Sequence, residues 1–194
     1  MIIKNNLTSQ ALGSDIHHAA QILKQGGVIA YPTEAVFGLG CLANNVYAIN
    51  KLLKLKKRPV NKGLILLAYD FTQFGPYIYP LEKTILKKIQ STWPGPATWI
   101  VPAPTQTSSL IRGQYHSVAI RISAHPIVRA LCQQCQSPII STSANITDNK
   151  MTYNSTEVYL QFKDQLDYIL EGSLGKSNKP TVIKDALNDK IIRN

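Results

Sequence analysis

The stretch Gly63-Leu64-Ile65-Leu66-Leu67-Ala68-Tyr69 decides the fold, because it is a nearly continuous apolar run of strand length. A strand without polar alternation is covered by the protein on both of its faces. Helical patterns occur around it at 14–25, 46–58, 80–90 and 125–135, and extended segments at 28–31, 97–101, 118–122 and 139–140. This alternation of strands and helices predicts an α/β fold with a twisted mixed sheet and flanking helices.

The ends of these elements follow from local signals. Ser14 is expected to cap the first helix, and Asn44 or Asn45 the second. The second helix must end near Arg58, because Pro59 disfavours helical geometry in the residue before it. We expect a loop through Gly38 and Gly40, a helix at 157–162, an extended segment at 167–170, and a closing hairpin of 181–183 with 190–193. Without repeats or a linker, the sequence predicts one domain over 1–194, with its core at about 14–193.

The charge of the chain is strongly positive and unevenly spread. Lysine and arginine number 21 against 11 acids, a net charge of +10, and no acid occurs between Glu34 and Asp70 or between Glu82 and Asp148. Such regions attract phosphate groups, although a solvated basic face is the alternative. With 44% apolar and 16% charged residues, no apolar run of membrane-spanning length and no signal peptide, we expect a folded cytoplasmic protein without a membrane partner.

Three motifs suggest chemistry that their context does not support. Gly38–Ala43 fits the dinucleotide fingerprint, but the acid required about 20 residues later is missing. Gly172–Ser177 ends like a phosphate-binding P-loop, but Leu170 stands where the first glycine is required. Cys132 and Cys135 form a C-x-x-C without a second ligand pair, so we expect ordinary reduced and partly buried thiols rather than a zinc site.

Polar residues that follow predicted strands are the remaining candidates for a site. Thr33 follows the strand at 28–31, Ser141–Asn145 follow the strand at 139–140, and Lys56 and Arg58 lie at a helix end. Arg121 lies inside a strand, where a charge without a partner is costly. Each has a structural alternative: a turn cap for Thr33, a capping loop for Ser141–Asn145, solvated charges for Lys56 and Arg58, and an edge strand for Arg121. No nucleophile triad or metal motif is evident, so catalysis would work by positioning and charge.

Five motifs together resemble the YrdC/Sua5 family of threonylcarbamoyl-AMP synthases, in its short bacterial form (the TsaC type). They are 30–40 (AYPTEAVFGLG), 56–59 (KKRP), 93–98 (WPGPAT), 118–121 (VAIR) and 141–145 (STSAN), and they come in the family's order. The resemblance implies a YrdC-like mixed sheet around a basic concave cavity. It also implies a nucleotidyltransferase that makes L-threonylcarbamoyladenylate and pyrophosphate from L-threonine, bicarbonate and ATP.

The resemblance also assigns residues. It implies catalytic roles for Lys56, Arg58, Ser143 and Asn145, and threonine contacts for Thr33, Arg121, Ser143 and Thr181. It implies ATP contacts for Lys56, Arg58, Lys62, Ser117, Ser141, Asn145 and Arg193. Leu67 stands where longer relatives carry a histidine. Mg²⁺ is expected to arrive with ATP, and no metal bound by the protein itself is expected.

The partners implied by the resemblance are those of tRNA modification. The adenylate would supply the threonylcarbamoyl-transferase complex (TsaD, TsaB and TsaE), which forms N6-threonylcarbamoyladenosine at position 37 of tRNAs that read codons starting with A. Direct binding of RNA or tRNA in the basic cavity is a further expectation. Two alternatives stay open: a non-enzymatic RNA-binding protein, and an enzyme that forms a carbamoyl adenylate from carbamoyl phosphate.

Overall fold

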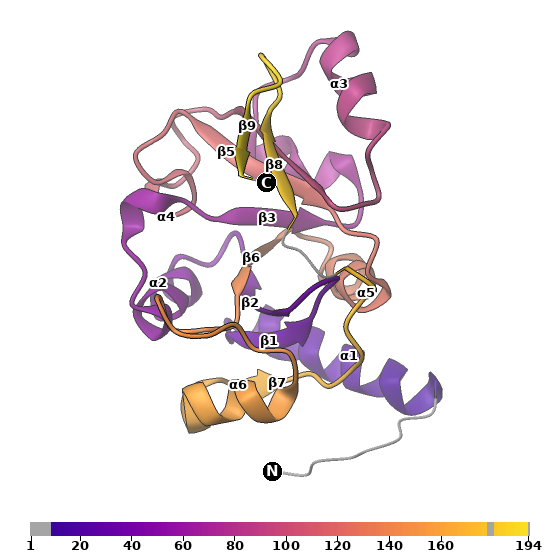
Figure 1. The fold of residues 1–194 in the computed structure, drawn as a ribbon, viewed down its shortest axis with the longest axis vertical. Helices are drawn as coiled ribbons and strands as arrows, with labels where there is room; N and C mark the ends of the chain where they lie inside the picture. Colours follow the sequence, from indigo (N-terminus) through magenta and orange to yellow (C-terminus); the bar gives the residue numbers. More distant parts are fainter. Residues whose placement is uncertain (1–8, 178–180, 194) are drawn as a thin grey trace.

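A computed structural model describes residues 9–177 and 181–193 of the protein (Figure 1). Its strands form one mixed sheet in the order β7-β1-β2-β6-β3-β5-β4-β8-β9. The strands are β1 (Ile29–Pro32), β2 (Phe37–Leu42), β3 (Ile65–Ala68), β4 (Ala97–Pro102), β5 (Ser117–Ile122), β6 (Ile139–Ser143), β7 (Tyr168–Ile169), β8 (Val182–Asp185) and β9 (Ile191–Arg193). The α-helices are α1 (Ser9–Lys24), α2 (Val46–Lys56), α3 (Lys83–Gln90), α4 (Ser109–Arg112), α5 (Pro126–Cys135) and α6 (Ser155–Phe162), and short 3₁₀ turns are η1 (Val60–Lys62), η2 (Phe71–Tyr77) and η3 (Lys163–Gln165). The α/β fold with a mixed sheet is confirmed.

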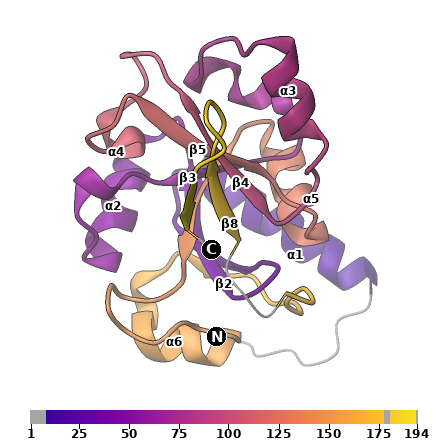
Figure 2. The ribbon, with the colours of Figure 1, turned by 45° about the horizontal axis from the view of Figure 1, so that its top comes forward.

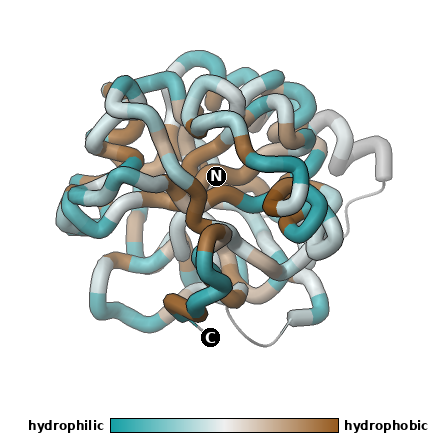
Figure 3. Tube along the Cα trace, turned by 90° about the horizontal axis from the view of Figure 1, so that it is seen from above, coloured by the Kyte–Doolittle hydropathy of each residue, from teal (hydrophilic) through white to brown (hydrophobic). Residues whose placement is uncertain are grey.

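The apolar run at 63–69 forms β3 in the middle of the sheet. It pairs in parallel with β5 and antiparallel with β6. Leu66 and Ala68 are buried in the larger apolar cluster, whereas Leu67 packs in a second cluster with side chains of α1 and α5. The prediction of a strand covered on both faces is therefore confirmed, and Figure 3 shows the hydrophobic segments gathered in the interior.

The alternation of side chains along β5 separates a core face from a polar face. Val118, Ile120 and Ile122 are buried in the larger apolar cluster. Ser117, Ala119 and Arg121 alternate with them and so point to the opposite face. The sequence of one strand thus supplies both a core surface and a row of positions for a site.

The hairpin predicted near the end of the chain is confirmed. Strands β8 and β9 pair antiparallel, and β8 adds to the sheet beside β4. Figure 2 shows this hairpin, in yellow, lying along the sheet next to β4. The ammonium of Lys88 on α3 donates to the Ala186 carbonyl at 2.9 Å and to the Asp189 carboxylate at 2.8 Å, which fastens the hairpin to the helix.

Two local predictions were wrong. The first helix begins at Ser9 rather than after Ser14, because alanine and leucine favour a helix enough to extend it across Gly13. Gly38 and Gly40 lie in β2 rather than in a loop. A Cβ atom on Gly40 would lie 2.5 Å from the Ile140 carbonyl oxygen and 2.8 Å from the Tyr31 ring, so glycine here permits close pairing of strands. The dinucleotide fingerprint is thus part of the sheet.

Of the two possible caps of α2, Asn45 is the one used. Its side-chain oxygen accepts a hydrogen bond from the backbone N–H of Ala48 at 2.9 Å. The helix ends at Lys56, and Lys57 adopts the left-handed conformation that ends many helices. This confirms the end expected ahead of Pro59. Across the described residues, no helix combines the length and apolarity that crossing a membrane requires.

Candidate active site

A cavity of about 510 Å³ lies on the polar face of the sheet. Its wall includes residues of β3, β5 and β6, of the turn after β1, and of the β8–β9 hairpin. Nine of the eleven residues predicted for the site line it: Thr33, Arg58, Lys62, Ser117, Arg121, Ser141, Ser143, Thr181 and Arg193. Lys56 and Asn145 are the other two. The fold therefore brings together positions that are spread over 160 residues of sequence.

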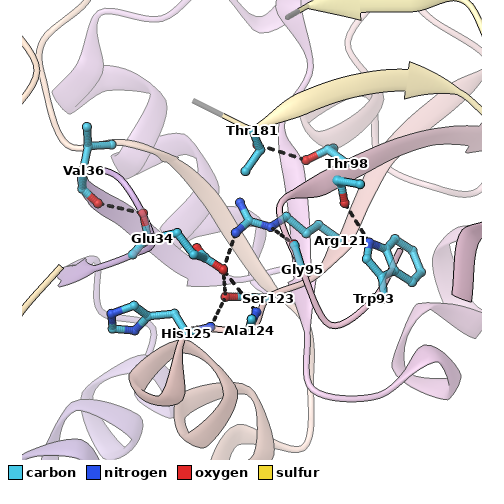
Figure 4. Close-up of polar contacts among 12 residues, drawn as sticks. Glu34, Val36, Trp93, Gly95, Thr98, Arg121, Ser123, Ala124, His125 and Thr181 are labelled. Atoms are coloured by element: carbon cyan, nitrogen blue, oxygen red, sulfur yellow. Dashed lines mark hydrogen bonds and ion pairs between the residues drawn. The ribbon is translucent and has the colours of Figure 1, made fainter. Parts of the chain in front are cut away.

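Arg121 is held in the cavity wall by an ion pair and a hydrogen bond (Figure 4). Its Nη2 forms an ion pair with Oε1 of Glu34, and its Nε donates to the Gly95 carbonyl at 3.0 Å. The same Oε1 accepts from the Ser123 hydroxyl at 2.7 Å and from the Ala124 backbone N–H at 3.1 Å. The Arg121 side chain is buried and that of Glu34 nearly so, with 8% and 13% of their surface exposed. Arg121 therefore lies in an inner strand with an acid as its partner, and the edge-strand alternative does not apply.

Glu34 is a site residue that the sequence analysis did not select. Burial by itself raises the pKa of its carboxyl, but the charge of Arg121 and the Ser123 hydroxyl outweigh burial and bring the pKa below its usual value. A signal for it existed, because Arg121 in a buried strand requires a partner and Glu34 directly follows Thr33. An acid in the turn after β1, among the residues expected at the site, was therefore a candidate partner.

Two threonines, Thr33 and Thr181, are among the residues that line the cavity. The Thr33 hydroxyl donates to the Val36 carbonyl at 2.7 Å, so the turn-cap role is present, and Thr33 lines the cavity as well. The Thr181 hydroxyl lies 3.3 Å from that of Thr98. Each hydroxyl keeps acceptor capacity for a ligand, because a hydroxyl carries two lone pairs.

Lys56 does not reach the cavity wall. Its ammonium donates to the backbone carbonyls of Ser143 at 2.6 Å and Asn145 at 2.5 Å. Burial, reinforced by the charge of Arg58, lowers the pKa of Lys56 to about 8. Lys56 thus holds the end of β6 in place through two backbone carbonyls, one of which belongs to Ser143, a residue of the cavity wall.

Asn145 is likewise turned away from the cavity. Its side-chain amide donates to the carbonyls of Ile146 at 3.0 Å and Asn149 at 2.8 Å, so it shapes the loop after β6. The capping-loop alternative for the Ser141–Asn145 segment therefore describes Asn145, whereas Ser141 and Ser143 line the cavity.

Four further cations line the same cavity as Arg121: Arg58, Lys62, Arg112 and Arg193. Burial, and then the charge of Arg121, lower the pKa of Arg193, so Arg193 lies between Arg121 and Arg58 in its electrostatic contacts. The Arg58 guanidinium donates to the Gly63 carbonyl, with Nη2 at 2.8 Å. Burial and the nearby charge of Arg193 lower the pKa of Arg58. Arg193 donates to the Thr181 carbonyl at 3.1 Å. These contacts leave N–H groups of both guanidinium groups available for an anion.

Gly113 lets the turn at 112–114 approach the segment at 61–63 closely. A Cβ atom on Gly113 would lie 2.4 Å from the Asn61 carbonyl oxygen and 2.6 Å from the Gly63 backbone nitrogen, and its φ of +66° also disfavours other residues. The turn at 112–114 therefore packs directly against the segment that carries Lys62 and Gly63. Arg112, which the sequence analysis did not select, is brought to the cavity by this turn.

The three cysteines are absent from the cavity lining, and each is a free, buried thiol. Burial raises the pKa of Cys132, and raises that of Cys135 to about 11. In the described part of the chain, no three or more His, Cys, Asp or Glu side chains gather so that they could hold a metal ion.

A mixed α/β sheet with a cavity that carries cations and hydroxyl groups among apolar side chains is typical of α/β proteins that bind small ligands. The chain belongs to the Sua5/YciO/YrdC family, whose model, described as "Telomere recombination", matches residues 21–194. It is 46% identical over 181 residues to the threonylcarbamoyl-AMP synthase of Photobacterium profundum, an alignment that covers 92% of this chain and 98% of the relative. It is 44% identical over 178 residues to that of Coxiella burnetii, covering 92% and 96%.

The solved structures give the same fold. P. abyssi Sua5 complexed with L-threonine superposes with a TM-score of 0.84 at 26% identity, over 94% of this chain and 53% of that one. The resemblance found in the sequence motifs is therefore confirmed for nearly the whole chain.

Proposed function

We propose that this protein is a threonylcarbamoyl-AMP synthase, a nucleotidyltransferase that forms L-threonylcarbamoyladenylate and pyrophosphate from L-threonine, bicarbonate and ATP. The observation that carries the proposal is one cavity that holds Arg121 beside hydroxyl groups, together with the cations Arg58, Lys62 and Arg193. Its 46% identity to a protein named for this activity supports the same conclusion.

The residues of the cavity divide into two groups that suit the two substrates. Arg121 would bind the threonine carboxylate, with Thr33, Thr181 and Ser143 near the hydroxyl-bearing side chain, because guanidinium groups match carboxylates in shape and charge. Arg58, Lys62 and Arg193 would bind the phosphates of ATP, and Ser117 and Ser141 would add hydrogen bonds. Lys56 would act by holding the carbonyls of Ser143 and Asn145, and Asn145 by holding the loop at 145–149.

The proposed reaction needs no protein nucleophile. Threonine's amine and bicarbonate give a carbamate with loss of water, and a carbamate oxygen attacks the α-phosphorus of ATP while pyrophosphate leaves. Cations that hold the leaving phosphates lower the barrier by stabilising the charge that develops on them. Mg²⁺ would enter with ATP, whose phosphates commonly serve as its ligands, and would share in neutralising pyrophosphate.

The product would be consumed by a threonylcarbamoyl transferase, the TsaD, TsaB and TsaE complex, to modify adenosine 37 of tRNAs that read codons starting with A. This step forms part of the proposal. Direct contact of the protein with tRNA is an independent question that a binding experiment with tRNA answers.

The proposal is tested by measuring pyrophosphate release with ATP, Mg²⁺, bicarbonate and single amino acids. Threonine should support release, whereas valine should support far less, because a site that bonds a substrate hydroxyl is left with unpaired groups by an analogue that lacks it. Removing bicarbonate should abolish the signal. Release that persists without bicarbonate would indicate simple amino-acid adenylation, and release that depends on carbamoyl phosphate would indicate carbamoyl transfer. Tight, salt-sensitive RNA binding without ATP turnover would identify an RNA-binding protein.

A further inference from the structure

The Arg121–Glu34 pair puts opposite charges side by side in the cavity wall. An arginine alone suits a simple anion, but this arginine has a carboxylate in direct contact, and both residues line the cavity. Their charges cancel, so the pair offers a cation and an anion next to each other. The ligand complementary to such a pair is itself neutral overall and carries one negative and one positive group close together.

Each partner retains capacity to bind a ligand. The contacts of the Glu34 carboxylate described above all fall on Oε1: from Arg121 Nη2, from the Ser123 hydroxyl and from the Ala124 backbone N–H. The backbone N–H of Glu34 itself also bonds to the carboxylate. A carboxylate offers about four acceptor positions, so Oε2 keeps capacity for a further donor in the cavity. Arg121 uses Nε for the Gly95 carbonyl and Nη2 for Glu34. In Figure 4 its remaining nitrogen points away from Glu34, toward Thr181.

The surroundings fix both groups in these directions. Ser123 accepts from the backbone N–H of His125 at 3.0 Å while its hydroxyl donates to Glu34, so the carboxylate is tied to the start of α5. The Gly175 N–H donates to the Thr33 carbonyl at 3.0 Å, which ties the turn after β1 to the 172–177 segment. A charge pair held from several elements loses little freedom when a ligand binds, which favours selective recognition.

We propose that Glu34 and Arg121 together recognise the free zwitterion of an α-amino acid, with Arg121 on the carboxylate and Oε2 of Glu34 on the amine. Contact with Glu34 then makes ligand binding depend on a free, unsubstituted amine. This inference deepens the proposed function and depends on it, because it assigns the group that holds the amine destined for carboxylation. The lowered pKa of Glu34 keeps its carboxylate ionised at neutral pH, in agreement with that role.

The test compares three ligands by calorimetry. L-Threonine carries both groups, (R)-3-hydroxybutanoate lacks the amine, and L-threoninol lacks the carboxylate. The wild-type protein should prefer threonine to both analogues. Glu34→Gln should reduce the preference for threonine over 3-hydroxybutanoate by at least tenfold, which corresponds to about 1.4 kcal/mol. The variant should bind threonine more weakly, because it loses a partner for the amine. It should bind 3-hydroxybutanoate more tightly, because it loses a negative charge that repels this anion. Both changes lower the preference for threonine.

The matched control is Asp164→Asn, which removes one negative charge at an exposed position outside the cavity lining and should leave the ratio within twofold. Glu34→Asp, which keeps the charge but shortens the side chain, should weaken threonine binding while preserving the preference, and it serves if Glu34→Gln does not fold. Equal wild-type binding of threonine and 3-hydroxybutanoate, or an unchanged ratio in Glu34→Gln, would overturn the inference while threonine-dependent pyrophosphate release continued. Absence of that release and of threonine binding in the wild type would overturn the proposed function, and this inference with it.

Discussion

Arg121 and Arg58 lie on the same cavity wall but in very different surroundings. Arg121 is buried on an inner strand and is paired with a carboxylate. Arg58 follows a helix end, is half-buried, and has a backbone carbonyl as its partner. Glu34 balances the charge of Arg121, whereas Arg58 has a second cation, Arg193, close to it; Arg193 is also near enough to Arg121 to be affected by its charge.

The difference indicates which ligand each region suits. A neutral charge pair favours a neutral zwitterion, whereas unpaired cations near one another favour a polyanion such as a triphosphate. The lowered pKa of Arg58, caused by burial and by Arg193, shows that like charges are held close together there. Such an arrangement is costly in the empty protein and becomes favourable when an anion binds. The following experiments test this division of the cavity.

The largest effect is expected at the buried pair. Arg121→Ala leaves the Glu34 carboxylate buried without its charge partner, which should lower the free energy of unfolding by about 3–5 kcal/mol. The double variant Glu34→Gln with Arg121→Gln removes both charges and should recover more than half of that loss. Urea unfolding measures both values. A loss below about 1 kcal/mol in Arg121→Ala would show that the pair contributes little to stability.

The next effect concerns catalysis at the unpaired cations. Arg58→Ala should reduce pyrophosphate release at least tenfold, which requires an interaction worth about 1.4 kcal/mol in the transition state. The KM for ATP should rise, whereas threonine affinity should stay within twofold, because Arg121 and Glu34 are untouched. Lys54→Ala, an exposed lysine of the preceding helix α2, is the control and should match the wild type. An equal loss of threonine and ATP affinity in Arg58→Ala would contradict the division into two regions.

The main elements of the fold could be predicted because their signals are local. The run at 63–69, the alternation in β5 and the restriction before Pro59 each act within a few residues. The strand containing Gly38 and Gly40 could not be predicted in this way, since those glycines are explained by the approach of Tyr31 and Ile140 from neighbouring strands. Glycine reads as a loop signal in sequence, but here it permits close contact between strands.

Most of the residues predicted for the site line one cavity, but the directions of Lys56 and Asn145 could not be predicted from the sequence. Lys56 and Arg58 are two residues apart, and residues at that spacing do not share a face of a helix. The helix also ends between them, with Lys57 in the left-handed conformation. As a result Lys56 turns inward to backbone carbonyls while Arg58 reaches the cavity. Glu34 could have been found by asking which acid partners a buried arginine.

A smaller effect is expected from the titration of Lys56. Its pKa of about 8 in the folded protein lies below the ordinary value of 10.5 in the unfolded chain, so between those pH values the unfolded chain binds more protons. Stability of the wild type should therefore rise with pH in that window, by about 1–3 kcal/mol relative to Lys56→Met. Urea unfolding at several pH values between about 7.5 and 10.5 measures the difference. Parallel curves for the two proteins would show that Lys56 titrates normally.

The smallest effect on activity is expected from the cysteines. Cys132 and Cys135 lie in the apolar cluster between α1 and α5, and the Cys132 thiol donates to the Leu67 carbonyl at 3.5 Å. Burial raises the pKa of both thiols, which disfavours the thiolate that binds metals and reacts. Replacing both with alanine should cost about 1–2 kcal/mol of stability and leave pyrophosphate release within twofold. Cys41→Ala, at a third buried thiol, is the control. Elemental analysis should find no stoichiometric zinc, and one tightly bound zinc that disappears in the double variant would refute a purely structural role.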